Sequence, residues 1–310
     1  MSFESVPTHS TETEQFAEKR QELHENLGIV FCTEQKDGTH TRLLDHIHLA
    51  ETLGLPSVQF DFRKRSEEEI IEACDTLRAF REAHPDVDIS IHGETPKIDP
   101  ETLEIQNKKH MSTTLEYASE LGIESYTMHP LALRDQLWKE LSAEAQHALL
   151  THYASLCAQS FTNHVTENTP SCSIAIENMP KKGAEGAWGQ TPEDIHTLVQ
   201  YISEYCMANG VTTETVEDHI GITLDINHAL HDVDPADWEA ELTSWFKIFG
   251  TRIRVIHLYA PSHYGETLNT KYQLVLDLAA RYSPDAHVFL ESKQDTEKTA
   301  EVYSSMHAAY

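Results

Sequence analysis

Short apolar runs recur along the chain, and a helical pattern separates each from the next. Eight runs with apolar or β-branched residues at nearly every position predict strands that are covered on both faces. They span 28–32, 57–62, 88–92, 125–129, 173–177, 221–225, 254–258 and 287–291. Helical patterns span 41–53, 66–83, 101–121, 133–165, 192–208, 235–248, 268–282 and 295–309. Eight strand–helix units predict an α/β protein with one (β/α)8 barrel, and an open doubly wound sheet is the alternative architecture.

Residue types that bind metal ions stand at the carboxyl ends of six of the predicted strands. They are His92, His129, Glu177, Asp225, His257 and Glu291. Because the carboxyl ends of barrel strands meet at one face, these side chains are expected to converge there, whereas an open sheet gathers its ligands at one switch point. His228 follows Asp225 by three residues and is expected to face the same cavity, as is His263 in the loop after His257. A mixed set of carboxylates and imidazoles suits zinc or manganese.

The termini and the cysteines indicate the surroundings of the barrel. Residues 1–27 are polar and are expected to form an N-terminal extension to a barrel domain at 28–310. The first residues lack the basic-then-apolar order of a signal peptide, and no apolar run reaches the roughly 18 residues of a membrane span. The 5 cysteines are widely spaced without a CxxC pair, which is typical of reduced thiols. The sequence therefore predicts a cytoplasmic protein without membrane association.

The charge is strongly one-sided, with 51 acidic against 23 basic residues and a formal net charge of −28. One interpretation is an acidic surface adapted to high salt, where dense carboxylates keep a protein soluble. The other is a chain that avoids polyanions. If the first holds, molar salt screens the charge, and the acidity then says little about binding to nucleic acid.

Two segments carry a resemblance to a known family. The first is SIAIEN, which contains Glu177-Asn178, and the second is GITLDINH, which contains Asp225-x-x-His228. Both resemble segments of the xylose isomerase-like TIM-barrel superfamily, and within it the endonuclease IV (AP endonuclease family 2) arrangement. The resemblance covers roughly residues 88–292. It implies a first metal ion held by His92, His129 and Glu177, and a second held by Glu177 as a bridge, Asp225, His257 and Glu291. In the third family site only His228 and His263 match, because Pro261 stands where the family has an aspartate. Two zinc ions are thus implied, with a third left open.

The implied ligands are compatible with two reactions. In a phosphoester hydrolase with two ions, Glu177 bridges the ions and Glu291 orients or deprotonates the attacking water. Abasic DNA or a small phosphoester is then the substrate. In a sugar or keto-sugar isomerase or epimerase, one manganese ion polarises the sugar oxygens, while Glu177 and Glu291 act as paired acid and base. His92 and His129 exceed the four ligands that an isomerase needs, which favours the hydrolase. A metal-binding barrel without activity is a third class.

Four further residues are candidates for contact with the substrate: Trp188, Tyr259, Tyr264 and Arg63. Trp188 is equally interpretable as an anchor of its loop, and the basic trio at 63–65 as a solvated turn. His46 and His48, in the first predicted helix, are not at ligand spacing and are expected at the surface. The sequence leaves open whether DNA is bound and how many subunits assemble.

Overall fold

Eight parallel strands close into one barrel, in which each strand pairs with its neighbours along the chain and β1 pairs with β8. The structure, a computed structural model, describes residues 12–32, 43–63, 65–99, 101–131, 133–165, 172–180, 188–260, 265–291 and 296–309. The strands are β1 (Gly28–Phe31), β2 (Ser57–Asp61), β3 (Asp88–His92), β4 (Ser125–Met128), β5 (Ser173–Glu177), β6 (Ile220–Asp225), β7 (Ile253–Tyr259) and β8 (His287–Glu291). The (β/α)8 fold predicted from the sequence is therefore confirmed.

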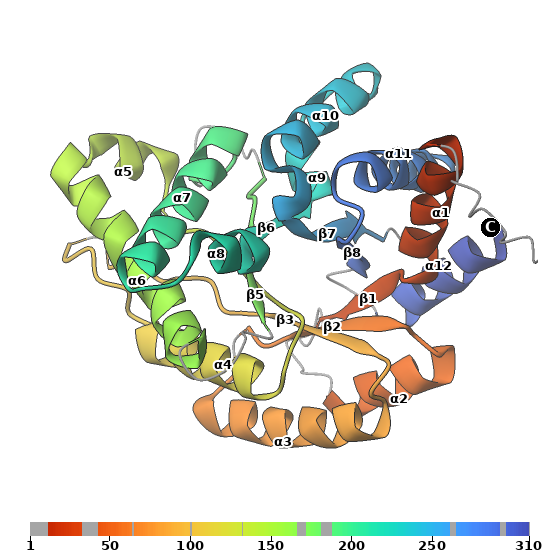
Figure 1. Cartoon of the computed structure of the whole chain (residues 1–310), viewed down its shortest axis with the longest axis horizontal. Coiled ribbons are helices and arrows are strands. Elements are labelled where there is room, and N and C mark those ends of the chain that lie inside the picture. Colours follow the sequence, from red (N-terminus) through yellow and green to blue (C-terminus); the bar gives the residue numbers. More distant parts are fainter. Residues whose placement is uncertain are drawn as a thin grey trace, which may run out of the picture.

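Helices surround the barrel on its outside (Figure 1). They are α1 (Glu12–Glu25), α2 (Leu43–Leu53), α3 (Glu67–Ala83), α4 (Lys108–Glu120), α5 (Asp135–Glu140), α6 (Ala143–Val165), α7 (Pro192–Ala208), α8 (Thr213–His219), α9 (Ile226–Ala229), α10 (Trp238–Phe249), α11 (Glu266–Tyr282) and α12 (Thr296–Ala309), with 3-10 turns at Pro235–Asp237 and Gly250–Arg252. Ser66 starts α3 with a capping box to Glu69, and Thr191 caps α7. Such caps satisfy amide groups that have no partner inside the helix.

The helices depart from the predicted pattern in three places. The helix expected at 133–165 is divided into α5 and α6, because Leu141 is extended and Ser142 accepts the Ala145 amide, as an N-cap does. Residues 101–107 precede α4 as turns, and Leu103 has a φ of 59°, which the interior of an α-helix excludes. The short helices α8 and α9 lie where no helix was expected.

His46 contradicts the sequence interpretation. It was expected at the surface, but it is 1% exposed and its ring stacks on Phe31 at a centroid distance of 5.0 Å. His48, on the same helix α2, is exposed as expected. Stacking between α2 and β1 buries the His46 ring in the layer between helix and barrel, where apolar residues normally lie.

A belt of polar side chains crosses the barrel interior below the carboxyl ends of the strands. Gln59 donates to Thr127 over 3.1 Å, and Thr127 shares a 2.8 Å hydrogen bond with Thr223. These three residues, from β2, β4 and β6, are fully buried, so each needs a partner inside the protein. The belt consequently fixes the orientation of Gln59 directly beneath the mouth of the barrel.

Helix α1, in the predicted N-terminal extension, lies alongside α11 (Figure 1). His24 in α1 shares a 2.7 Å hydrogen bond with the Tyr272 hydroxyl, and Arg20 pairs with Asp277.

All five cysteines are free thiols. Among the residues that the structure describes, no helix is both long and apolar enough to cross a membrane.

Candidate metal centre

Strand register brings the sequence-predicted ligands to one mouth of the barrel. Glu177 ends β5, and the next pair of strands sets Asp225 beside His257. One strand further, Glu291 on β8 is level with Tyr259 on β7. Each of these residues lies at the carboxyl end of its strand, the face where barrel enzymes carry their active sites.

Glu177 lies at the centre of the cluster and presents its two carboxylate oxygens to different partners. Its Oε2 lies 2.9 Å from Nε2 of His92 and 2.9 Å from Nε2 of His129. Its Oε1 lies 3.6 Å from Nδ1 of His228 and 3.7 Å from Nδ1 of His257. The carboxylate therefore separates two groups of donors, one on each oxygen, as a bridging ligand between two ions does.

The second group has the spacing of metal ligands. Glu177, Asp225, His257 and Glu291 each offer a ligand atom within 4.8 Å of the others. Nδ1 of His257 is buried without a hydrogen-bond partner among the described residues, 3.7 Å from carboxylate oxygens of both Glu177 and Glu291. Two ligands of a tetrahedral ion with bonds of 2.0–2.2 Å lie about 3.4 Å apart. These separations are too long for hydrogen bonds but suit a shared ion, so the residues fit a metal.

The remaining ring nitrogens of the three strand-end histidines are held from outside the cluster. The contacts are His257 Nε2 with Gln59 Oε1 at 2.7 Å, His129 Nδ1 with Thr95 Oγ1 at 2.5 Å, and His92 Nδ1 with the Gly93 carbonyl at 3.2 Å. An amide oxygen can only accept, so His257 donates through Nε2, and the lone pair of its Nδ1 faces the cluster, as in metal-binding histidines. Both ring nitrogens of His92 lie at hydrogen-bond distance from oxygens that can only accept, the Gly93 carbonyl and the Glu177 carboxylate, so a neutral His92 donates to one of the two.

Asn178 holds the corner between β6 and α9. Its side chain accepts from the Asp225 amide at 2.7 Å and donates to the Asp225 carbonyl at 3.1 Å. Asp225 caps α9 by accepting from the His228 amide at 2.8 Å, and His228 Nδ1 donates to the Asn178 carbonyl at 2.8 Å. Asp225 and His228 are therefore fixed relative to Glu177, and His228 retains Nε2 for a ligand.

The pKa values of the buried acids show a site that attracts positive charge. Burial would raise the pKa of Glu177, but His129 and hydrogen bonds from the neighbouring imidazoles hold it well below its usual range. Burial and the carboxylates of Glu177 and Glu291 raise the pKa of Asp225 to about 6, against the opposing effect of His228. Burial lowers the pKa of His257, but the surrounding carboxylates outweigh it and raise that pKa. A bound cation would take the place of these protons.

Comparison with known proteins identifies the family. The family model for xylose isomerase-like TIM barrels matches residues 47–269. The chain belongs to this family. No curated protein sequence matches the chain significantly.

Solved structures of similar fold span several reactions. Endonuclease IV from Thermus thermophilus has 19% identity and a TM-score of 0.58, covering 91% of this chain and 98% of its own. D-Psicose 3-epimerase, in a structure with D-fructose, has 12% identity and a TM-score of 0.59 over 92% and 97%. A probable 3-DHS dehydratase from Bacillus anthracis has 12% identity and a TM-score of 0.58 over 91% and 98%. At these identities the similarity shows the fold, and the reaction is not determined.

Arg63 lies at the rim of the candidate metal centre. The sequence also allowed the basic trio 63–65, to which it belongs, to be a solvated turn. Its Nε and Nη2 donate to the two oxygens of Asp61 at 2.9 and 2.8 Å, and Nη2 lies 3.8 Å from Glu291. Burial raises the pKa of Asp61, but Arg63 outweighs it and lowers that pKa. Arg63 thus places a guanidinium next to the carboxylates of Asp61 and Glu291.

The other predicted substrate contacts are placed differently. Trp188 is 4% exposed and stacks on Trp138 at 4.4 Å, which is the geometry of a loop anchor. Tyr259 is 41% exposed at the end of β7. His263 and Tyr264 lie outside the described residues.

Three residues with contacts in the site were missed from the sequence. Gln59 and Asp61 interrupt the apolar run SVQFDF, and a polar residue within a buried strand is a signal that identifies both. Thr95 follows β3 in an irregular loop and carries no comparable signal. Its contact with His129 depends on the path of that loop, which the residue pattern does not define.

Proposed function

We propose that the protein is a divalent-metal-dependent phosphoester hydrolase of the endonuclease IV type, with a pair of zinc ions at the barrel mouth. The observation that carries this proposal is the position of Glu177. Two imidazoles lie at 2.9 Å from one of its oxygens, and the other oxygen faces a separate set of donors. A pair of ions uses both oxygens of Glu177 and both imidazoles as ligands, whereas a site for one ion needs only the four residues on the other side.

The residues divide between the two ions. His92 and His129 would hold the first with Glu177, and the second would be held by Glu177, Asp225, His257 and Glu291. When bound, the ions stabilise charge on the phosphoryl oxygens and lower the pKa of water. Glu291 orients the attacking water and accepts its proton, while Arg63 at 3.8 Å keeps this carboxylate in place. His228 retains Nε2 for a third ion or for an oxygen of the substrate.

A sugar isomerase or epimerase is the second candidate. The four-residue cluster at Glu177, Asp225, His257 and Glu291 is complete by itself, and one manganese ion there would suffice. Glu177 and Glu291 then act as paired acid and base. In that case His92 and His129 contact the sugar instead of an ion.

The number of bound ions discriminates between the two. We expect two equivalents of zinc in protein purified without chelator and one equivalent in His129→Ala. The matched control His152→Ala changes an exposed histidine on α6 and should retain two. One equivalent of manganese in all three proteins would favour the isomerase and contradict the binuclear site.

Activity gives the complementary test. Duplex DNA with an abasic site, a small phosphodiester and a ketohexose are assayed at low and molar salt, and chelation should abolish turnover. Glu291→Gln should lower kcat for the phosphoester by about 10²–10⁴-fold, the range for a general base. If the DNA and the diester stay intact at every salt while the ketohexose is epimerised, the hydrolase proposal is wrong.

A further inference from the structure

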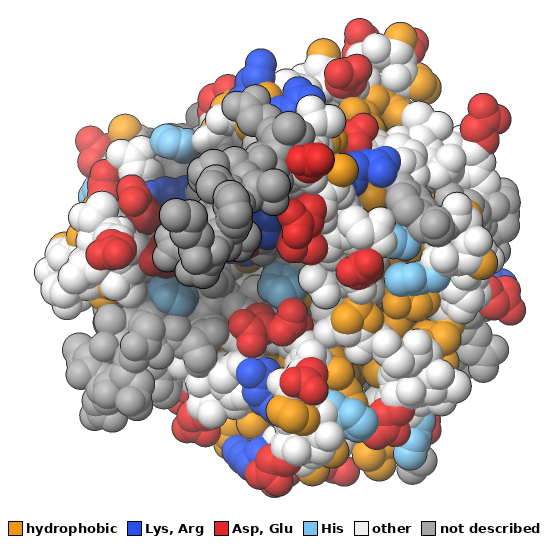
Figure 2. All heavy atoms as spheres, turned by 45° about the vertical axis from the view of Figure 1, so that its right-hand side comes forward, with side chains coloured by type: hydrophobic (Ala, Val, Ile, Leu, Met, Phe, Trp, Pro, Cys, Tyr) orange, Lys and Arg blue, Asp and Glu red, His pale blue; other side chains and the backbone are white. Residues whose placement is uncertain are grey.

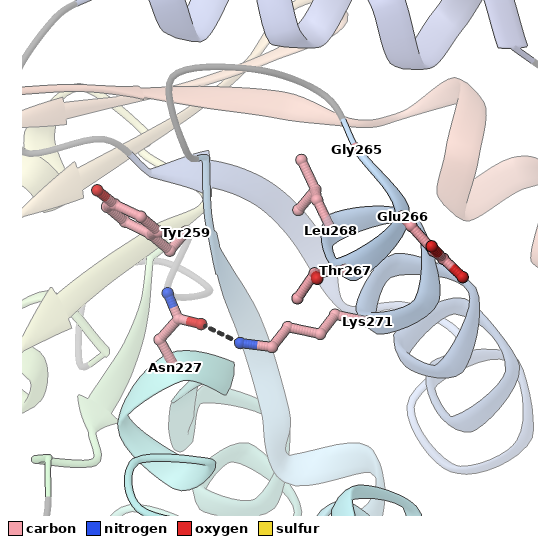
Figure 3. A pocket seen from close by; sticks show the side chains of 7 residues that line it. All are labelled: Asn227, Tyr259, Gly265, Glu266, Thr267, Leu268 and Lys271. Atoms are coloured by element: carbon pink, nitrogen blue, oxygen red, sulfur yellow. Dashed lines mark hydrogen bonds between the residues drawn. The ribbon is translucent and has the colours of Figure 1, made fainter. Parts of the chain in front are cut away.

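A pocket of about 310 Å³ opens beside the metal centre, between α9 and the start of α11 (Figure 3). Asn227 on its wall lies between Asp225 and His228 in the sequence, and Tyr259 lies two residues after His257. The pocket and the metal centre therefore share the β6–α9 corner and the end of β7. Its volume is at the lower end of the range for ligand pockets, about 300–1,000 Å³.

Lys271 from α11 extends into this pocket. Its Nζ donates to Oδ1 of Asn227 at 2.8 Å and lies 4.8 Å from the centre of the Trp238 ring. Within the described residues no carboxylate oxygen lies at ion-pair distance from it, and Glu266, on the same helix, turns away from it (Figure 3). Burial lowers the pKa of Lys271, against the opposing effect of Asp225. A half-buried ammonium whose partners among the described residues are an amide and an aromatic face favours an anion from solution.

Two further features of the pocket supply hydrogen-bond donors. Because Oδ1 of Asn227 accepts from Lys271, its amide nitrogen points toward Tyr259 (Figure 3). Helix α11 begins at Gly265 without a side-chain cap, so the first amide groups of this helix are not bonded to a capping side chain. The side chain of Thr267, in that first turn, also lies in the pocket. Donors of this kind, together with an ammonium, suit phosphate.

We infer that this pocket binds a second phosphate group of the substrate while the metal centre takes the scissile phosphoester. The inference rests on the proposed hydrolase function for the division of roles, but the binding of phosphate by the pocket does not. It assigns the substrate to a chemical class: phosphoesters that carry another phosphate beside the one that is cleaved.

Binding of inorganic phosphate to the metal-free protein tests the pocket by itself. Titration calorimetry in the presence of chelator should show one site in the wild type. Lys271→Met should weaken it by about tenfold or more, the effect of losing one charged hydrogen bond. Lys247→Met removes an exposed lysine of α10, changes the net charge equally, and should leave the affinity unchanged. Equal affinity in the wild type and Lys271→Met, or no binding to the wild type, overturns the inference.

A second variant keeps the inference testable if Lys271→Met does not fold. Asn227→Asp keeps the size of the side chain but sets a carboxylate beside the ammonium, and it should weaken phosphate binding at least as much. Melting temperatures show whether each variant is folded. Retained binding in folded Asn227→Asp contradicts the inference as well.

Kinetics with the zinc enzyme test the phosphate subsite separately from the proposed hydrolase function. Two diesters are compared, one with and one without a neighbouring phosphate. Lys271→Met should raise KM about tenfold or more for the first only, because the second makes no contact with the pocket. An equal effect on both diesters overturns the subsite. If phosphate binds as expected but neither diester is hydrolysed, the proposed function fails and the anion site stands.

Discussion

The ion pair at the rim of the barrel joins buried Asp61 to Arg63, whose side chain is 19% exposed, and breaking it leaves an uncompensated charge. We predict that Arg63→Met lowers the free energy of unfolding of the metal-free protein by about 3 kcal/mol, the lower part of the range for buried pairs. Asp61→Asn/Arg63→Met should be less destabilised than Arg63→Met, because the remaining carboxylate is gone. Urea unfolding of the wild type, Asp61→Asn, Arg63→Met and the double variant completes the cycle. A double variant as unstable as the sum of the single variants would show that the two side chains do not interact.

His46 makes the stability of the protein depend on pH. Burial, reinforced by Arg65, lowers its pKa to about 4, whereas an unfolded histidine titrates near 6.5. Between these values the unfolded chain binds the proton and the folded protein does not, so the free energy of unfolding falls as the pH falls. Relative to neutral pH, His46 lowers the free energy of unfolding by about 2 kcal/mol at pH 5 and by about 3 kcal/mol below pH 4.

Unfolding in urea at pH 7.5 and pH 5 measures this effect. His46→Leu should show a smaller loss between the two pH values than the wild type, by about 2 kcal/mol. His48→Leu, on the exposed side of the same helix, should keep the wild-type dependence. The same pH dependence in all three proteins would contradict a buried neutral His46.

The sequence identified strand-end residues that meet at the barrel mouth, but not the contacts that orient them. His92, Glu177 and Asp225 stand where a buried strand ends, and that position alone directs a side chain to the barrel mouth. The partners of these ligands depend on contacts across the barrel, such as Gln59 reaching His257 from a strand 198 residues away in the chain. His46 was misplaced for a related reason, because its burial depends on the ring of Phe31 across the gap between helix and strand.

At the scale of the elements, the strands were predictable because both of their faces are covered. Most strands therefore appear as apolar runs, which polar residues such as Gln59 and Asp61 interrupt in β2, and observed and expected strand bounds differ by at most one residue at either end. The helices are less constrained, because one face meets solvent and accepts many residue types. The break between α5 and α6 at Leu141-Ser142 and the turns at 101–107 involve local hydrogen bonds that periodicity does not reveal.

The backbone at Gly93, just after β3, lies very close to the side chain of Tyr126 on β4. A Cβ atom at this position would lie 2.0 Å from the Tyr126 hydroxyl, so Gly93→Ala must displace β3 from β4 or the tyrosine from its place. We predict a loss of about 1–3 kcal/mol in the free energy of unfolding, as for overpacked cores. Because Gly93 follows His92 directly, zinc affinity should fall too.

A double-mutant cycle identifies the cause. Gly93→Ala/Tyr126→Leu should be less destabilised than the sum of the two single variants, since the smaller side chain makes room for the methyl group. Additive losses in urea unfolding would indicate that the clash is relieved elsewhere.

At the scale of the whole molecule, the fold and the reaction are determined by different parts of the chain. The barrel is shared with an endonuclease, an epimerase and a probable dehydratase at identities of 12–19%. Their common fold requires apolar strands and amphipathic helices, a requirement that many sequences meet. The reaction depends on side chains at one mouth of the barrel and on the loops around it, some of which lie outside the described residues.

The net charge of −28 makes the salt dependence of activity a property of the molecule as a whole. Acidic side chains are spread over the face in Figure 2, so we expect a polyanion to be repelled at low salt. The screening length falls from about 30 Å at 0.01 M salt to about 3 Å at 1 M. If the substrate is abasic duplex DNA, kcat/KM should therefore rise with salt, the reverse of the trend that counterion release produces. A small phosphodiester with a single charge is the control and should show a weak dependence, because it experiences the same field with far less charge. A kcat/KM for DNA that falls steadily from low to molar salt would show that a basic surface governs its binding, and the acidity would then carry no information about the substrate.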